Sequence, residues 1–181
     1  GREGEAPVLI AETGGQNCMV VDSSALPEQV VDDVVRSAFS SAGQRCSALR
    51  VLYLQDDIAD DVLDMLKGAM EELTVGEPWR LSTDVGPVID ERARSRLRSH
   101  IEKMKKEARF HFACDLPHSL ASGTYVAPHL FEISSIRQLD EEVFGPVLHV
   151  VRYERKQLHK VIEEINSTGY GLTMGVHSRV E

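Results

Sequence analysis

Short apolar segments alternate with longer amphipathic segments along the chain, and this alternation restricts the possible folds more than any other feature. The short segments have the character of buried strands, whereas the longer ones repeat apolar residues at helical spacing. Because parallel strands need helix-length connections, the pattern favours an α/β fold with a mostly parallel sheet, arranged as a three-layer αβα domain. The expected strands are 8–10, 18–21, 50–54, 110–112, 125–127, 147–153 and 172–177, and the expected helices are 27–42, 57–73, 91–108 and 158–166.

One domain over residues 1–181 is the simplest organisation, because no repeat, low-complexity segment or linker interrupts the pattern. The formal net charge is −9 and basic residues do not cluster, which argues against a nucleic-acid surface. The chain has no run of about 18 apolar residues, so we expect no membrane span. Its three cysteines lack the spacing of a metal site, and so sparse a set is typical of a reducing compartment such as the cytoplasm.

Cys46 lies in the break between a long expected helix and a buried strand. Gly43 lets the backbone turn sharply there and keeps bulk away from the thiol. Arg45 adds positive charge nearby, which favours the thiolate that a nucleophile needs. These features make Cys46 a candidate nucleophile, although a Gly-x-x-Cys pattern is not specific and taken alone favours a buried structural cysteine.

Two further segments combine an acidic residue with glycine. Glu12 precedes Gly14-Gly15, an arrangement that suits close approach of backbone to a ligand and makes Glu12 a candidate general base. Glu142 and Phe144 precede a Gly-Pro turn into a buried strand. Taken singly, the first segment is compatible with a surface glutamate in a glycine turn, and the second with a turn that carries a core phenylalanine.

Taken together and in this order, the three segments resemble the motifs of the aldehyde dehydrogenase superfamily. The segments are Glu12-Thr13-Gly14-Gly15-Gln16-Asn17, Gly43-Gln44-Arg45-Cys46 and Glu142-Val143-Phe144-Gly145-Pro146. The spacing between Glu12 and Cys46 also resembles that of the family. Residues 11–22, 37–54 and 76–90 are similar to the glutamate-semialdehyde (1-pyrroline-5-carboxylate) dehydrogenase module of bacterial proline utilization A proteins, and the resemblance covers essentially the whole chain.

The resemblance implies NAD-dependent oxidation of L-glutamate γ-semialdehyde, which forms when 1-pyrroline-5-carboxylate opens its ring, to L-glutamate in proline catabolism. Cys46 would attack the aldehyde carbon to give a thiohemiacetal, which loses a hydride to NAD and becomes a thioester. Glu12 would activate the water that hydrolyses the thioester. The backbone N–H of Cys46 would help to hold the oxyanion.

The resemblance also implies binding roles for four residues. Glu142 would hydrogen-bond the nicotinamide ribose hydroxyls, Phe144 would pack against the nicotinamide, and Gly14 would lie close to its carboxamide. Ser47, directly after the nucleophile, would help to bind the α-carboxylate of the substrate. The other interpretation of Ser47 is a plain polar residue that opens a strand.

Complete members of the family are much longer than this chain, which has no Gly-x-Gly-x-x-Gly loop or other nucleotide-phosphate motif. We therefore expect a catalytic-domain fragment that lacks the nucleotide-binding domain and the C-terminal anchor and oligomerisation segment. Its partners would be the small-molecule substrate and the rest of a parent polypeptide. By the resemblance, that parent includes a FAD-dependent proline dehydrogenase domain and forms a homo-oligomer. The fragment alone would be inactive.

Other functions are compatible with the same residues. The chain could be a non-catalytic scaffold of the same fold, or a family member that acts on another aldehyde or transfers the acyl group to CoA. Glu12 and Cys46 argue against a scaffold, and a water-activating base such as Glu12 is unnecessary when CoA is the acceptor. An unrelated α/β binding domain would require all three motifs to match in order by chance.

Overall fold

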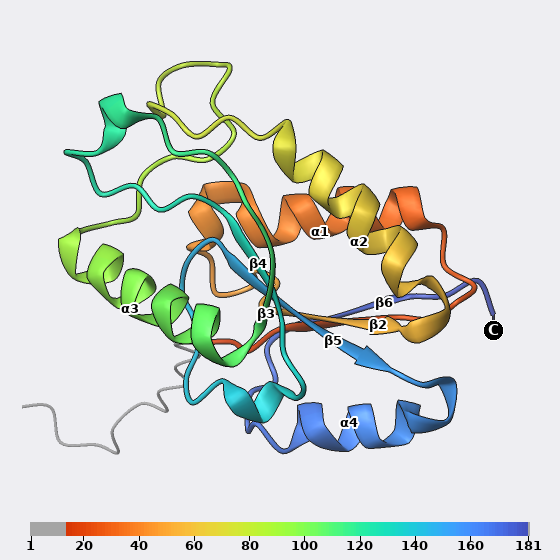
Figure 1. Ribbon diagram of the computed structural model, residues 1–181. Coiled ribbons are helices and arrows are strands. Elements are labelled where there is room, and N and C mark those ends of the chain that lie inside the picture. The colour runs from red at the N-terminus through yellow and green to blue at the C-terminus, as the bar shows by residue number, and fades with distance from the viewer. Residues whose placement is uncertain (1–13, 181) are drawn as a thin grey trace, which may run out of the picture.

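A single sheet with helices on both faces forms the centre of the computed structural model, which describes residues 14–180 (Figure 1). The strands are β1 (Cys18–Val21), β2 (Val51–Gln55), β3 (Arg109–Ala113), β4 (His129–Glu132), β5 (Val147–Tyr153) and β6 (Met174–His177). The helices are α1 (Pro27–Phe39), α2 (Asp56–Glu71), α3 (Glu91–Glu107) and α4 (Leu158–Asn166). The strand order is β3-β4-β5-β2-β1-β6, and every neighbouring pair is parallel except β3 and β4, which are antiparallel.

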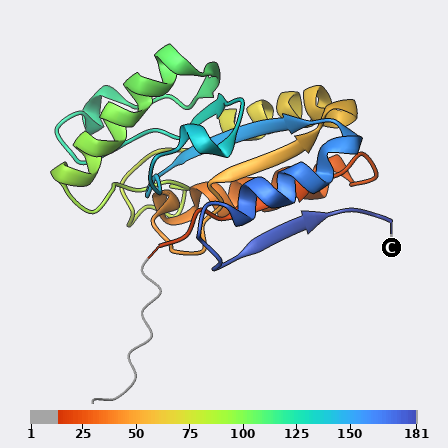
Figure 2. The same ribbon diagram turned by 90° about the horizontal axis from the view of Figure 1, so that it is seen from below.

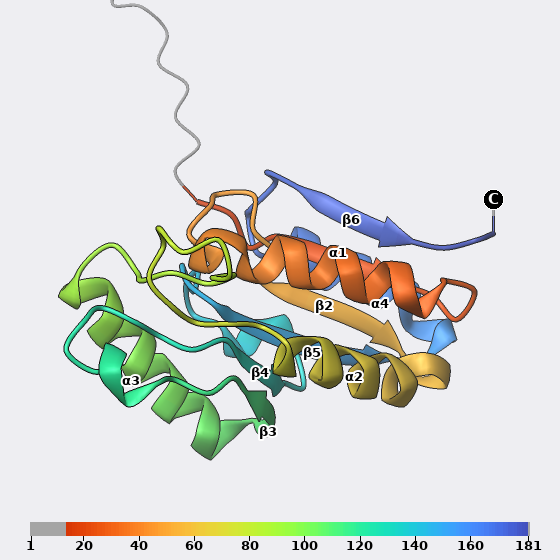
Figure 3. The same cartoon turned by 90° about the horizontal axis from the view of Figure 1, so that it is seen from above.

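Helices α1 and α2 cover one face of the sheet, and α3 and α4 cover the other (Figures 1 and 3). Two side chains of β5 illustrate the two faces. Arg152 forms an ion pair with Asp60 of α2 at 2.7 Å, whereas His149, three residues earlier and therefore on the opposite face, lies 2.9 Å from His100 of α3. The expected three-layer αβα arrangement with a mostly parallel sheet is confirmed.

The middle of the sheet is its most deeply buried part. Every residue of β2 is buried, and so is every residue of β5 except Arg152. Strands that are covered by helices on both faces of the sheet are buried on both faces, and their residues are therefore mostly apolar. The borders are more open, since Phe110 of β3 and Met174 and Val176 of β6 are exposed. Figure 2 shows β6, in dark blue, at one border of the sheet.

The sequence of helix α3 contains both a capping residue and an apolar stripe. The carboxylate of Asp90 accepts a hydrogen bond from a first-turn backbone N–H at 2.7 Å and caps the helix. Leu97, Ile101 and Met104 recur at helical spacing and are buried, while the charged residues between them face solvent. Among the helices of residues 14–180, none combines the length and the apolar character that crossing a membrane requires.

The strand expected at 125–127 is wrong, because β4 begins only after Pro128. Two of the three residues are buried, which explains their apolar character without strand pairing. Pro128 has no N–H to donate to a ladder, and its carbonyl oxygen accepts a hydrogen bond from the Cys114 N–H at 3.0 Å. Parallel pairing with β5 then starts at His129. The strand expected at 8–10 lies outside the described residues.

His149 is a fully buried polar residue in the middle of the sheet. Its Nδ1 lies 3.2 Å from the carbonyl oxygen of Arg50, and its Nε2 lies 2.9 Å from Nε2 of His100. A carbonyl oxygen can only accept, so Nδ1 carries the proton and Nε2 accepts from His100. The His149 ring must then be neutral, because its Nε2 has to accept. Burial accordingly lowers the pKa of His149 to about 3 and that of His100 to about 4.

The free energy of unfolding should therefore decrease as the pH falls. A histidine in the unfolded chain takes up a proton near pH 6.5, whereas the native state excludes it until the pH reaches about 3 at His149. Within this window the unfolded state binds more protons, and His149 lowers the free energy of unfolding by about 1.4 kcal/mol per pH unit at most. Urea unfolding at several pH values between 7 and 4 measures the slope.

Replacing His149 tests how much this buried residue contributes to the pH dependence of the free energy of unfolding. A His149→Gln variant should lose stability at pH 7 but show a shallower fall with pH than the wild type. His159→Gln is the matched control, because this histidine is exposed on α4 and should leave the slope unchanged. Equal slopes for the wild type and His149→Gln would contradict the assignment.

Candidate active site

The candidate residues lie in loops that enter the sheet at the amino ends of its parallel strands. Residues 14–17 lead into β1, residues 43–50 into β2, residues 142–146 into β5 and residues 170–173 into β6. Because these four strands run in the same direction, their amino ends share one border of the sheet. Segments that are far apart in the sequence therefore meet there.

Cys46 is exposed on a turn that the Ala48 N–H closes by donating to the Arg45 carbonyl oxygen at 3.1 Å. The other two cysteines, Cys18 and Cys114, are buried, and burial raises the pKa of each of these thiols to about 12. A nucleophilic thiol must be reachable and able to ionise. Cys46 is thus the cysteine whose position suits nucleophilic chemistry.

Three consecutive residues with positive φ turn the chain just before Cys46. Ser41, Ala42 and Gly43 have φ values of 56°, 53° and 65°, in the left-handed region. Such values are uncommon for residues with a Cβ, and they cluster at functional sites. Gly43 also packs against Gly145, whose carbonyl a Cβ at position 43 would strike. The turn therefore depends on glycine at this position.

Asn17 holds the Cys46 turn through its buried side-chain amide. Its Nδ2 donates to the carbonyl oxygens of Cys46 at 2.7 Å and Ala48 at 2.8 Å. Its Oδ1 accepts a hydrogen bond from the Thr173 N–H at 3.2 Å. One amide thus joins the loops that precede β1, β2 and β6, so the position of Cys46 depends on the sheet.

Arg50 joins the Cys46 turn to the loop before β5. Its Nη1 donates to the carbonyl oxygens of Gly43 at 2.6 Å and Gly145 at 3.4 Å, and its Nη2 donates to that of Arg45 at 3.0 Å. Nη2 and Nε also reach Oε1 of Glu142, at 3.0 and 3.3 Å. Burial lowers the pKa of the Arg50 guanidinium, and the bond to Glu142 opposes this shift.

Glu142 is held by both of its carboxylate oxygens. Oε1 faces Arg50, and Oε2 accepts a hydrogen bond from the Gly15 N–H at 3.1 Å. A Cβ on Gly14 would lie 2.7 Å from Oε2, so only glycine at that position leaves enough room for the Glu142 carboxylate. Phe144 is 44% exposed, and its ring centroid lies 5.1 Å from Cζ of Arg50.

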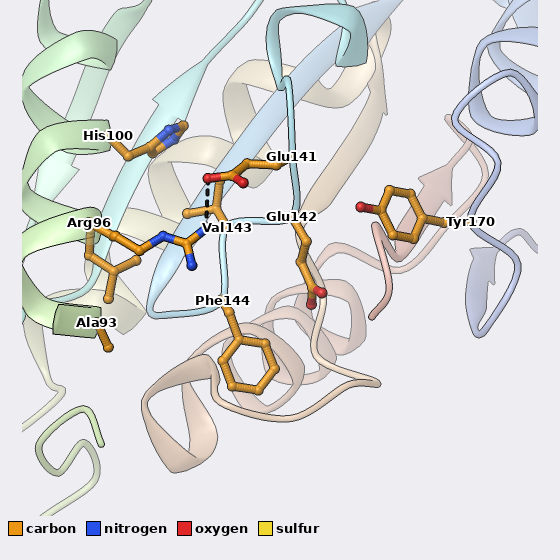
Figure 4. A pocket seen from close by; sticks show the side chains of 9 residues that line it. Ala93, Arg96, His100, Glu141, Glu142, Val143, Phe144 and Tyr170 are labelled. Atoms are coloured by element: carbon orange, nitrogen blue, oxygen red, sulfur yellow. Dashed lines mark hydrogen bonds and ion pairs between the residues drawn. The ribbon is translucent and has the colours of Figure 1, made fainter. Parts of the chain in front are cut away.

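A cavity of about 490 Å³ opens beside this carboxylate, between α3 and the loops that precede β5 and β6 (Figure 4). Glu142, Phe144 and Tyr170 line it on the loop side, and Arg96 lines it on the α3 side. Arg96 forms an ion pair with Glu141 at 2.8 Å. A carboxylate beside an exposed aromatic ring suits a ligand that carries both hydroxyl groups and a flat ring.

The structure brings Gly14, Glu142 and Phe144 together, although the sequence separates the first from the other two. Cys46 and Ser47 are exposed on the neighbouring turn and are not part of the cavity lining. They connect to the Glu142 loop through one buried arginine rather than by direct contact. The nucleophile candidate and the ligand-binding candidates therefore occupy adjacent surfaces.

Glu12, the candidate general base, lies outside the described residues. Its motif continues into residues 14–17, which do lie at this border of the sheet. Within residues 14–180, no group of three or more His, Cys, Asp and Glu side chains is arranged to hold a metal ion.

Asn17, Arg50 and Tyr170 are site residues that sequence reasoning missed. Asn17 and Arg50 bind mainly backbone carbonyls, which leave no trace in a sequence. The available signal was their position, since each polar side chain directly precedes an apolar strand whose interior has no room for charge. Tyr170 lies in a glycine turn that gave no reason to place it near Glu142.

Alkylation of the three thiols tests the exposure of Cys46. In the native protein at mildly alkaline pH, iodoacetamide should label Cys46 before Cys18 or Cys114, since both of these are buried with a pKa of about 12. Peptide mass mapping of timed samples measures the order of labelling. In urea the three rates should converge, and equal labelling of the native protein would count against the assignment.

Substitution of Gly43 tests the left-handed turn. Gly43→Ala should destabilise the fold by more than about 1 kcal/mol, because the Cβ is strained at this φ and strikes the Gly145 carbonyl. Gly68→Ala is the matched control. Gly68 lies inside α2 with open space around its Cα, so alanine should stabilise the fold by about 0.5–1 kcal/mol. Urea unfolding measures both changes, and a neutral Gly43→Ala variant would exclude the tight packing.

Known proteins resemble this chain along its whole length. The profile of the aldehyde dehydrogenase family matches residues 3–181. The bifunctional protein PutA of Escherichia coli (strain K12) is 57% identical over 99% of this chain, which spans 14% of that protein. The 1-pyrroline-5-carboxylate dehydrogenase of Geobacillus sp. (strain WCH70) is 36% identical over 94% of this chain, which spans 33% of that protein.

Solved structures agree with these sequence matches. A crystal structure of a bifunctional proline utilization A (PutA) protein superposes with a TM-score of 0.93 at 57% identity, covering 99% of this chain and 18% of its own. A 1-pyrroline-5-carboxylate dehydrogenase structure superposes with a TM-score of 0.83 at 35% identity, covering 94% of this chain and 32% of its own. By its sequence and its fold, the chain belongs to the aldehyde dehydrogenase family.

Proposed function

We propose that this chain is the catalytic part of an NAD-dependent L-glutamate γ-semialdehyde dehydrogenase that acts in proline catabolism. The names of its relatives, bifunctional protein PutA and 1-pyrroline-5-carboxylate dehydrogenase, support this substrate, because the pyrroline ring opens to the semialdehyde. One structural observation carries the proposal. The single exposed thiol, Cys46, sits on a turn that Arg50 ties to Glu142 and that Asn17 ties to the loop before β6.

Cys46 supplies the covalent step. Its thiolate attacks the aldehyde carbon, so that a C–S bond forms and the carbonyl oxygen becomes an oxyanion. Among residues 14–180 the Cys46 N–H has no hydrogen-bond acceptor, so it can donate to this oxyanion. Ser47 is exposed beside Cys46, and its hydroxyl would help to bind the α-carboxylate of the substrate.

The residues beside the cavity fit the nicotinamide end of NAD. The Glu142 side chain is 12% exposed, and its carboxylate would accept hydrogen bonds from the ribose hydroxyls. The exposed ring of Phe144 would pack against the nicotinamide, and Gly14, beside the Glu142 carboxylate, would lie close to the carboxamide. NAD supplies the hydride acceptor when it is bound, and the substrate carbon stays on Cys46 as a thioester.

Glu12 completes the reaction as the general base. It takes a proton from a water molecule while the water oxygen attacks the thioester carbon. The C–S bond then breaks, the Cys46 thiolate is restored, and L-glutamate leaves. The proposal for Glu12 rests on the family motif in residues 12–17.

We propose that other parts of a longer polypeptide supply the nucleotide-binding domain and the anchor and oligomerisation segment. The relatives support this, since the chain spans only 14% of one and 33% of another. A FAD-dependent proline dehydrogenase domain and a homo-oligomer belong to the same proposal, which the word bifunctional in the name of PutA supports. Three free cysteines favour a reducing compartment such as the cytoplasm.

The whole protein encoded by the gene should produce NADH from 1-pyrroline-5-carboxylate, as followed by absorbance. Cys46→Ala removes the nucleophile and should lower kcat by at least about 10³-fold. Glu12→Gln slows thioester hydrolysis but not hydride transfer, so kcat should fall by about 10²- to 10⁴-fold while an initial burst of NADH persists. Cys114→Ala, at a buried thiol, should leave kcat unchanged.

Each alternative gives a different result in the same assay. A requirement for CoA would identify an acylating enzyme, and activity with other aldehydes alone would change the substrate. A whole protein that makes no NADH with any aldehyde would be a scaffold, which contradicts the proposal. Steady-state NADH production by the isolated 181-residue chain would show that no further domain is needed.

A further inference from the structure

Arg50 is a buried cation that contacts both halves of the candidate site. Its side chain is 1% exposed. On one side its guanidinium donates to the carbonyl oxygens of Gly43 and Arg45, within the Cys46 turn. On the other side it donates to the carboxylate of Glu142 at 3.0 Å. No step of the proposed reaction uses this side chain.

A guanidinium suits these contacts better than an ammonium group. Its five N–H donors lie in one rigid plane, so a single group can reach acceptors in several directions at fixed angles. Here the guanidinium reaches two backbone carbonyls of the loop before β2 and one of the loop before β5. A lysine at position 50 would keep the charge but would lose this geometry.

The contacts leave Glu142 one defined orientation. Two donors of Arg50 occupy Oε1, and the Gly15 N–H donates to Oε2. A carboxylate has about four lone-pair sites, so the side of Oε2 that faces the cavity keeps acceptor capacity for a ligand hydroxyl. The donors that orient the carboxylate thus leave it able to bind.

Stability alone does not account for a buried arginine at this place. Removing two charges from water costs free energy that their attraction often only balances, so buried ion pairs contribute little net stability. The burial of Arg50 carries this cost, since its surroundings disfavour the charged form. Geometric specificity is the role that such a pair can serve.

We propose that Arg50 is a positioning residue for the dinucleotide. By holding Glu142 and the Cys46 turn with one rigid group, it keeps the nicotinamide ribose at a constant distance from the thiol. This inference rests on the proposed function, because it takes Glu142 as the ribose ligand and Cys46 as the nucleophile. Phe144 belongs to the same arrangement, since its ring lies over the Arg50 guanidinium.

Arg50→Lys in the whole protein is the informative variant, with Arg109→Lys as its control at an exposed position of β3. Arg50→Lys should raise the KM and the Kd for NAD by about tenfold or more, and leave the KM for the aldehyde unchanged. The alkylation rate of Cys46 should change by about threefold or more, because the turn loses two hydrogen bonds. Arg109→Lys should change none of these quantities.

A double-mutant cycle shows whether Arg50 acts through Glu142. Glu142→Gln removes the proposed ribose ligand, so adding Arg50→Lys to it should raise the Kd for NAD by less than about threefold. Isothermal titration calorimetry with NAD measures the four binding constants without the aldehyde. The effect of Arg50→Lys on the Kd for NAD, measured with Glu142 present and with Glu142→Gln, gives a ratio that is the coupling between the two residues.

Three results would overturn the inference: an unchanged Kd for NAD in Arg50→Lys, an equal effect with and without Glu142, or an Arg50→Lys protein that unfolds where Glu142→Gln folds. An active wild type with normal NAD binding by Arg50→Lys would reject the inference and leave the proposed function intact. A wild type that binds NAD but does not oxidise the aldehyde would reject the proposed function, while calorimetry still decides the role of Arg50. Absence of NAD binding by the wild type would reject both.

Discussion

The buried guanidinium of Arg50 is the constraint on which the arrangement of the candidate site depends. A buried charge is costly unless every polar contact around it is made, and Arg50 finds its acceptors on two separate loops. Moving either loop would leave the charge without part of its acceptors. The turn that carries Cys46 and the carboxylate of Glu142 are therefore coupled although neither touches the other. The backbone of Arg50 is also held in place, because its carbonyl oxygen accepts a hydrogen bond from the fully buried His149.

The direction of the strands explains where this arrangement can form. Ligand sites of open α/β sheets usually lie at the carboxyl ends of the strands. Here the candidate residues gather at the amino ends of β1, β2, β5 and β6, where Asn17 and Arg50 directly precede β1 and β2. At this border α1 presents its carboxyl end, and Arg45 donates to the carbonyl oxygens of Arg36 and Ser37 in its last turn. Arg45 therefore caps a helix, besides any effect of its charge on the thiol.

Apolar periodicity and sequence motifs were sufficient to predict some helices, strands and site residues, but not the contacts that connect the site. The mostly apolar segment of β5 predicted a strand, because both faces of the sheet are covered there. The stripe of Leu97 and Ile101 predicted helix α3, because one face of that helix is buried. The run at 125–127 was misleading, since burial beside Pro128 also selects apolar residues without pairing. The motifs located Cys46 and Glu142 but not their connection, which runs through backbone carbonyls that any sequence possesses.

In the proposed reaction, Cys46 forms the covalent bond to the substrate. The most direct test of this step is to quench the Glu12→Gln whole protein with acid during turnover of 1-pyrroline-5-carboxylate and NAD, and to map the adduct by peptide mass spectrometry. Slow hydrolysis in this variant lets the acyl-enzyme accumulate. We expect a glutamyl thioester on the peptide that contains Cys46. NADH formation with the adduct on Cys18 or Cys114, or with no adduct on any peptide, would contradict it.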